Sequence, residues 1–173
     1  MTRRAPCRLP VRLQQKVRSC RSLVATVRRL REQGHRIVFA NGCFDLLHVG
    51  HVTLLERAKR LGDILIVAIN SDHSVRALKG AHRPVMPQQD RARLLAALSS
   101  VDYVTIFDDP TPYQLIKVLQ PDVLVKGADW RLGGIVGHEL IQRRGGRVVR
   151  IPLVDGCSTT QLLNRIRRLL RNS

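Results

Sequence analysis

The sequence predicts an α/β fold, a three-layer sandwich in which helices cover both faces of a five-stranded parallel sheet. Short apolar runs alternate with segments of helical periodicity along the chain. The apolar runs are continuous in Val, Ile and Leu, which is typical of parallel strands that are buried on both faces. Because 173 residues suffice for one domain and hardly for two, we expect a single domain over residues 16–173.

Each expected element has its own signal. The first helix, residues 22–33, carries Leu23, Val27 and Leu30 at helical spacing, and Gly34 follows its end. The apolar runs predict strands at residues 36–41, 64–70, 101–107, 122–126 and 147–153. Helical spacing and flanking Gly or Pro residues predict further helices at residues 54–61, 88–98, 112–119, 137–144 and 159–170. Ligands of such folds bind beyond the carboxyl ends of the strands, so the residues after each strand are the candidate site.

Composition and charge exclude several classes of protein. No run of 18 apolar residues occurs, which argues against a membrane-spanning helix. The four cysteines form no CxxC pair, which argues against a zinc ribbon and a disulfide scaffold and favours the cytoplasm. The net charge of +17 is concentrated in residues 1–34, with +9, and residues 142–173, with +7. Such segments suit nucleic acid or an anionic membrane surface, but without interleaved aromatic residues we favour solvated helix faces and expect neither partner. We expect residues 1–15 to be a disordered basic extension.

The segment after the first expected strand carries the strongest motif. His48 and His51 lie three residues apart around Gly50, at the start of a helix. A helix N-terminus favours phosphate, the two imidazoles fall on one side, and glycine permits close backbone approach to a ligand. Two donors placed there would stabilise the charge that develops as pyrophosphate leaves a triphosphate. Two other interpretations stay open: a zinc site that includes Cys43 but lacks a fourth ligand, and histidines that only cap the helix.

The wider motif resembles that of a known family. Gly42-Cys-Phe-Asp-Leu-Leu-His-Val-Gly-His51 is similar to the HxGH signature of the cytidylyltransferase-like nucleotidyltransferases, whose fold is a Rossmann-like sandwich. Later segments resemble the D-glycero-β-D-manno-heptose 1-phosphate adenylyltransferases: Ala68-Ile-Asn-Ser-Asp72, Leu78-Lys-Gly80 with Arg83-Pro-Val85, Val125-Lys-Gly-Ala-Asp129 and Gly156-Cys-Ser-Thr-Thr160. The resemblance covers about residues 16–170. It implies the transfer of AMP from ATP to heptose 1-phosphate, giving ADP-heptose and pyrophosphate for the lipopolysaccharide core, by an enzyme without the sugar-kinase domain that many relatives carry.

The resemblance also implies roles for individual residues. His48, His51 and Lys79 would be catalytic, with Lys79 expected in a loop after the second strand. The implied nucleotide-binding residues are Gly42, Cys43, Phe44, Gly50, Arg91, Gly127, Asp129, Ser158, Thr159 and Thr160. The implied residues for the sugar phosphate are Asp45, Asp72, Arg83 and Lys126. Ordinary interpretations stay open beside these: surface residues for Lys79, Arg83 and Arg91, turn or loop acids for Asp72 and Asp129, and helix capping for Ser158.

Two departures from the family pattern keep other functions open. Ala128 and Trp130 stand where Gly and Tyr are expected, and the run resembles that of cytidylyltransferases of the glycerol-phosphate type. The alternatives are a CTP-dependent enzyme acting on glycerol or ethanolamine phosphate, and a basic nucleic-acid-binding protein with a vestigial nucleotide site. Residues 156–160 favour the heptose enzyme. Mg²⁺ is implied by the triphosphate chemistry, no metal-ligating residue is assigned, and the oligomeric state is left open, with a homodimer considered.

Overall fold

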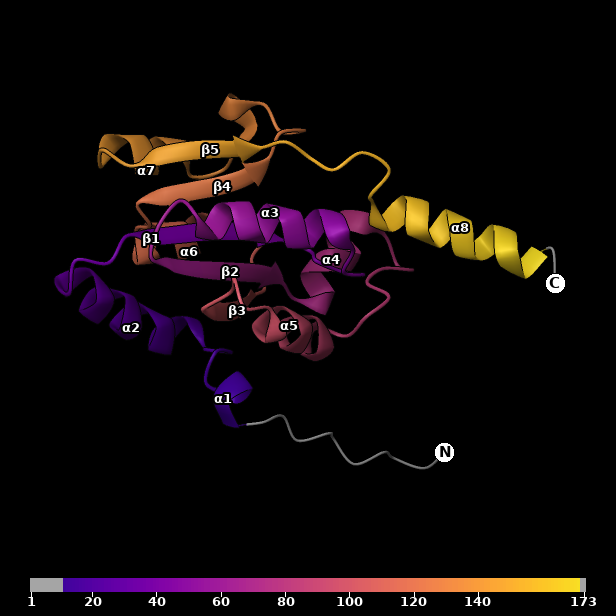
Figure 1. Ribbon diagram of the computed structural model, residues 1–173, viewed down its shortest axis with the longest axis horizontal. Coiled ribbons are helices and arrows are strands. Elements are labelled where there is room, and N and C mark those ends of the chain that lie inside the picture. The colour runs from indigo at the N-terminus through magenta and orange to yellow at the C-terminus, as the bar shows by residue number, and fades with distance from the viewer. Residues whose placement is uncertain (1–10, 172–173) are drawn as a thin grey trace.

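The computed structural model describes residues 11–171 and contains one five-stranded sheet (Figure 1). The strand order is β3-β2-β1-β4-β5, and each neighbouring pair is parallel. The strands are β1 Ile37–Gly42, β2 Ile64–Asn70, β3 Tyr103–Phe107, β4 Val123–Gly127 and β5 Arg147–Ile151. The α/β fold class with a five-stranded parallel sheet is therefore confirmed.

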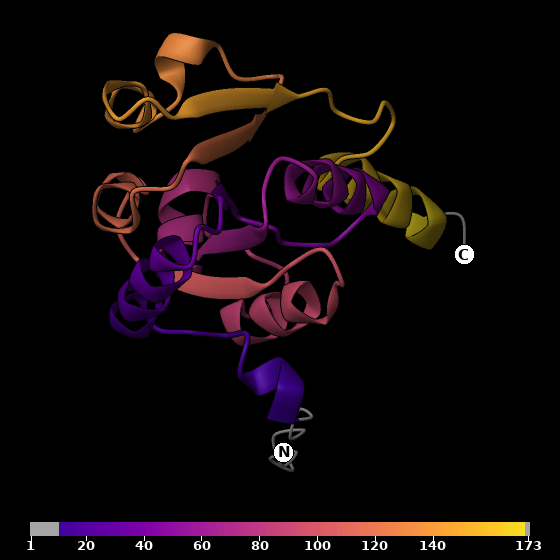
Figure 2. The same ribbon diagram turned by 60° about the vertical axis from the view of Figure 1, so that its left-hand side comes forward.

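Helices cover both faces of this sheet (Figure 2). Their bounds are α1 Val11–Gln14, α2 Cys20–Glu32, α3 Val49–Lys59, α4 Asp72–Lys79, α5 Gln88–Ala97, α6 Tyr113–Leu119, α7 His138–Arg143 and α8 Thr159–Arg171, with a 3₁₀ turn at Leu132–Gly134. Helices α3 and α5 pack on one face, and α2, α6 and α7 pack on the other. Helix α8 leaves the sandwich and projects beyond it (Figure 1). No helix among residues 11–171 is long and apolar enough to cross a membrane.

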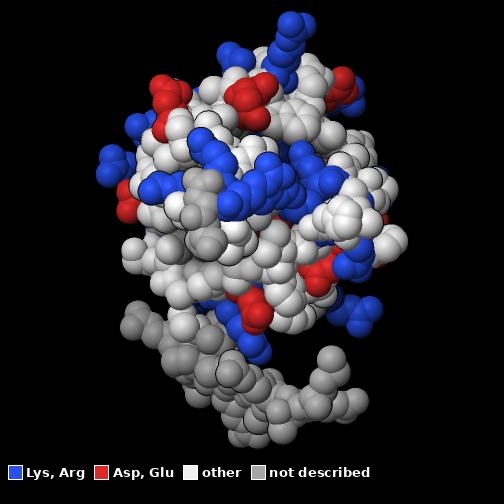
Figure 3. Space-filling view, turned by 90° about the vertical axis from the view of Figure 1, so that its right-hand side faces the viewer, with Lys and Arg blue, Asp and Glu red and all other residues white. Residues whose placement is uncertain are grey.

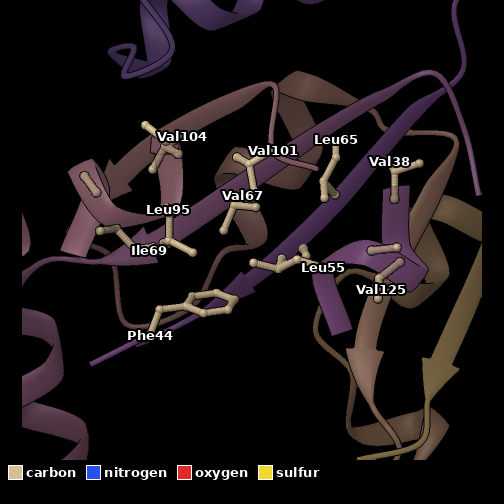
Figure 4. Close-up of a cluster of buried hydrophobic side chains, with 14 of the residues drawn as sticks. Val38, Phe44, Leu55, Leu65, Val67, Ile69, Leu95, Val101, Val104 and Val125 are labelled. Atoms are coloured by element: carbon tan, nitrogen blue, oxygen red, sulfur yellow. The ribbon is translucent and has the colours of Figure 1, made fainter. Parts of the chain in front are cut away.

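The two core clusters follow from the alternation of side chains along the central strand. Val38 and Ala40 point to the face under α3 and α5, where Phe44 and Leu55 join them (Figure 4). Ile37 and Phe39 point to the opposite face, among residues of α2 and α6. Because both faces of β1 are buried, its sequence is continuously apolar, which is the pattern that predicts a parallel sheet.

The order of the strands positions the site. The chain runs outward from β1 to β2 and β3, then returns to place β4 on the other side of β1. The carboxyl ends of β1 and β4 therefore border the point where the strand order changes direction, which is where open α/β sheets bind ligands. Asn41 and Gly42 end β1 there, and Lys126 and Gly127 end β4.

Three predicted boundaries are corrected. Helix α3 begins at Val49 instead of residue 54, because His48 is extended and serves as its N-cap. Lys79, expected in a loop, is the last residue of α4, whose start is capped by the Ser71 side chain accepting from the Ser74 amide at 3.0 Å. Of the extension expected over residues 1–15, the first ten lie outside the described residues, and Val11–Gln14 forms a short helix.

Candidate active site

A stacked pair of histidines lies where β1 turns into α3. The rings of His48 and His51 are 3.8 Å apart between centroids and inclined by 25°. The spacing predicted that both imidazoles would lie on one side of the helix start, and the structure places them so. The Phe44 ring packs against the pair, with its centroid 5.1 Å from that of His51. The positive φ of 45° at Phe44 belongs to the tight turn between the strand and the helix.

The electrostatic state of the pair is unusual. Burial lowers the pKa of His51 to about 4, with the nearby charge of His48 as a second cause, and burial also lowers the pKa of His48. Both rings are therefore neutral at pH 7 in the free protein. Their buried Nδ1 atoms have no hydrogen-bond partner among the described residues. A buried polar atom without a partner costs free energy unless a ligand or water satisfies it, so this pair is suited to bind a polar ligand.

Gly50 allows the last loop of the chain to approach the histidines. A Cβ at this position would lie 3.0 Å from His48 Nδ1 and 3.2 Å from Cys157 Cβ. The glycine was expected to make room for a ligand, but the space is taken by the chain itself. As a result the start of α8, at Thr159, lies beside the start of α3, at Val49. Two helix N-termini with their free N–H groups thus converge near the histidines, which favours an anionic ligand.

Arg91 joins the segments that frame the site. Its side chain is fully buried, although it was expected to contact the nucleotide. The guanidinium donates to the carbonyls of Cys43 at 2.5 Å, Asn70 at 2.9 Å and Met86 at 3.0 Å, and to the Asp72 carboxylate at 2.7 Å. These partners follow β1, end β2 and precede α5. Arg91 therefore positions the loop that leads to the histidines, and Asp72 balances its buried charge.

Asp45 and Arg83 form a second structural clamp. The carboxylate of Asp45 is buried and accepts from Arg83 Nε at 2.6 Å and from the amides of Val85 and Met86 at 2.8 and 3.0 Å. Burial alone would raise the pKa of Asp45, but these hydrogen bonds outweigh it and hold the pKa below its usual value. Both residues were expected to bind the sugar phosphate. In the structure they bind each other and fix the loop after α4.

Two lysines remain as cations near the end of β1. Lys79, the last residue of α4, is exposed and forms no ion pair among the described residues. Its charge is close enough to Cys43 to act on the pKa of that thiol, in the direction of lowering it. Lys126 donates to the carbonyl of Asn41 at 3.1 Å and lies over the Trp130 ring at 5.2 Å. Burial lowers the pKa of Lys126 to about 8. Both lysines are thus placed to meet an anion near Cys43.

Several other residues expected to bind the nucleotide make contacts within the described chain. The Phe44 side chain is buried in the core. A Cβ on Gly42 would lie 3.2 Å from the Phe44 ring, and one on Gly127 would collide with the Asp129 carboxylate, so both glycines make room for the chain. Ser158 accepts from the Gln161 amide at 3.1 Å and caps α8, which leaves Thr159 and Thr160 in its first turn. Asp129 is exposed after β4 and remains available to a ligand.

Two asparagines belong to the site that were not predicted as site residues. Asn41, the penultimate residue of β1, has a buried Oδ1 without a partner among the described residues. Asn70 ends β2, is buried, and donates to the Ser74 hydroxyl at 3.0 Å. A polar residue that closes an otherwise apolar strand is the signal that could have identified both.

The described residues offer no protein-held metal site. No group of three or more His, Cys, Asp or Glu side chains within residues 11–171 is placed to hold a metal ion. The zinc interpretation of Cys43, His48 and His51 is therefore wrong. Burial raises the pKa of the Cys43 thiol in spite of the cations near it.

Comparison with known proteins agrees with this geometry. Residues 39–164 match the family model described as Cytidylyltransferase-like. Two curated relatives, both called "Bifunctional protein HldE", are 52% identical over 151 residues in Syntrophotalea carbinolica and 54% identical over 152 residues in Koribacter versatilis. These matches cover 87% and 88% of this chain but only 31% of either relative, so the chain spans about a third of their length.

Solved structures show the same fold. A lipopolysaccharide core biosynthesis protein from Thermoplasma volcanium superposes with a TM-score of 0.58 at 27% identity, over 70% of this chain and 98% of that one. Pantothenate synthetase from Thermus thermophilus superposes with a TM-score of 0.57 at 17% identity, over 80% of this chain and 62% of that one. The second likeness concerns the fold alone.

The buried imidazole of His51 predicts a pH dependence of stability. The native ring takes up a proton only near pH 4, whereas in the unfolded chain it does so near its ordinary pKa of about 6.5. Between these values the unfolded state binds more protons, so the free energy of unfolding should fall as the pH is lowered from about 6.5 toward 4. Urea unfolding at several pH values should show a shallower decline for His51→Gln. His82→Gln, which removes an exposed imidazole, should keep the wild-type profile, and an unchanged profile in His51→Gln would contradict the burial of this ring.

Proposed function

Because the chain belongs to the cytidylyltransferase-like family, we propose that it transfers AMP from ATP to D-glycero-β-D-manno-heptose 1-phosphate, releasing pyrophosphate. The product would be ADP-heptose for the lipopolysaccharide core. The motifs at residues 68–85, 125–129 and 156–160 support this acceptor, as does the likeness to a solved lipopolysaccharide core biosynthesis protein. The proposal includes a cytoplasmic location, which agrees with the free thiols of Cys20, Cys43 and Cys157.

One observation carries the proposal. The stacked, neutral histidines have buried Nδ1 atoms without partners and lie where the N-termini of α3 and α8 converge. A helix N-terminus and imidazole donors together suit the phosphates of a nucleotide. A nucleotide bound there would place its negative charge beside the imidazoles and raise the lowered pKa of His51.

The reaction needs positioning more than an activated nucleophile. An oxygen of the sugar phosphate attacks the α-phosphorus of ATP in line; the new P–O bond forms as the bond to the pyrophosphate oxygen breaks. No covalent enzyme intermediate is required. His48 and His51 would donate to the phosphate oxygens on which charge accumulates, because donors fixed in place stabilise such charge without reorganisation. Lys79 would hold the incoming phosphate, and Lys126 and Asp129 lie at the end of β4, on the other side of β1.

Mg²⁺ fits this scheme as an ion that arrives with the triphosphate. The described residues contain no cluster of His, Cys, Asp or Glu that would hold it on the protein alone. Mg²⁺ commonly keeps several waters and binds through substrate phosphates with few protein ligands. When bound, it would neutralise part of the phosphate charge; the steps assigned above to the histidines and Lys79 do not depend on its position.

Nucleotide choice tests the proposal most simply. Pyrophosphate release should be measured with ATP and CTP, each against heptose 1-phosphate, glycerol phosphate and ethanolamine phosphate. We expect ATP with heptose 1-phosphate to give the highest kcat/KM, since the segment Gly156–Thr160 follows the pattern of the heptose enzymes. Equal or better turnover of CTP with glycerol phosphate would replace this proposal with the cytidylyltransferase alternative.

The role of the histidines predicts a kinetic defect. His51→Ala should lower kcat by about 10²–10³, the usual loss when one donor to transition-state charge is removed. The protein should remain folded by circular dichroism, because the ring lies at the edge of the core. His82→Ala, which removes an exposed histidine outside the pair, is the matched control and should retain wild-type kcat. A fully active His51→Ala protein would show that the pair has no part in the chemistry.

A further inference from the structure

Helix α8 has an apolar face that the rest of the described chain does not cover. None of its residues is buried. The exposed fractions are 36% for Leu162, 43% for Ile166 and 73% for Leu170. The helix projects beyond the sandwich (Figure 1). Its apolar face is therefore open to a partner.

The residues of α8 are segregated around the helix axis. At about 100° per residue, Leu162, Leu163, Ile166, Leu169 and Leu170 fall within one arc of about 120°. Arg165 and Arg167 lie at the two borders of this arc, and Arg168 and Arg171 lie on the side away from it. The helix contains no Asp or Glu, and no ion pair within the described residues involves these arginines. Helix α8 is therefore amphipathic, with an apolar face bordered by arginines.

The surroundings of α8 carry the same charge. Seen from the end at which α8 projects, Lys and Arg side chains gather in the middle of the molecular face, and acids lie nearer its edge (Figure 3). Helix α8 itself contributes four arginines and no acid. A partner of this surface must therefore be anionic as well as apolar, and it must be broad enough to face the helix and the residues around it.

These requirements distinguish between the partners. Pairing with α8 of a second copy would bring Arg165 and Arg167 against arginines of that copy, and neither helix offers an acid to balance them. A nucleic acid would satisfy the arginines but leave the apolar arc in water. An anionic lipid surface meets both demands, since acyl chains accept the apolar side chains while arginines at the borders reach the headgroups.

We propose that α8 binds the surface of an anionic lipid bilayer, lying in the plane of the headgroups with its apolar arc inserted and its bordering arginines on the lipid phosphates. This is a peripheral contact, since the helix is too short and too charged to cross the membrane. It is independent of the proposed reaction. It would place the histidine site, which lies beside the first turn of α8, close to the membrane surface.

Sedimentation with lipid vesicles tests the proposal. The full chain should bind vesicles of phosphatidylcholine and phosphatidylglycerol in equal parts, bind vesicles of phosphatidylcholine alone much more weakly, and dissociate as salt is raised. Ile166→Glu should weaken binding by at least about tenfold, because it removes a large apolar side chain from the inserted face. Asn164→Glu is the matched control: it adds the same charge to the same helix, but on the side away from the apolar arc, and it should bind more tightly than Ile166→Glu.

Four outcomes would overturn the proposal. The first is no binding to the anionic vesicles, and the second is equal binding by Ile166→Glu and Asn164→Glu. The third is tighter binding to duplex DNA or RNA that Ile166→Glu leaves unchanged, which would assign the surface to nucleic acid. The fourth is a dimer, measured by light scattering, that Ile166→Glu converts to monomers. Since both positions are exposed, circular dichroism should show both variants folded like the wild type.

Discussion

The buried guanidinium of Arg91 is the interaction on which the candidate site depends. Its hydrogen bonds reach the carbonyl of Cys43 after β1, the carbonyl of Asn70 at the end of β2 and the carbonyl of Met86 before α5. A charge removed from water is tolerated only when it is paired, and Asp72 provides that pairing at the first turn of α4. The strands, the loop before the histidines and two helices are thereby held in one geometry, which a catalyst that works by positioning requires.

The candidate site that Arg91 holds in place is suited to an anionic ligand, although its two histidines carry no charge in the free protein. The histidines are neutral because burial lowers their pKa values, so the free protein avoids the cost of two buried cations. The attraction for phosphate would come from helix N-termini, from N–H donors and from Lys79. A bound triphosphate would add the charge that makes protonated imidazoles favourable, so binding and proton uptake would be linked.

The sequence was sufficient for the fold and for the centre of the site. Continuous apolar runs predict the five buried strands, and the HxGH spacing predicts the stacked histidines. It was insufficient where contacts between residues distant along the chain determine the role of a side chain. In the sequence Arg91 is an ordinary helix residue, and its role depends on carbonyls from three segments that are distant along the chain. Asp45 and Arg83 were expected to contact the substrate, but in the structure they bind each other. Helix α4 was missed because its short amphipathic pattern has one strong apolar residue, Val75, on its buried side.

The central claim is that Arg91 holds the site in its working geometry, and the turnover of Arg91→Lys tests it most directly. Lysine keeps the charge that Asp72 balances but cannot form the four hydrogen bonds of the guanidinium. With ATP and heptose 1-phosphate at saturation, and the protein folded by circular dichroism, kcat should fall by about 10² because the histidine loop is displaced. Arg93→Lys, on the same helix but partly exposed, should retain wild-type kcat. If the wild type is active and Arg91→Lys matches it, the frame described here does not control the site.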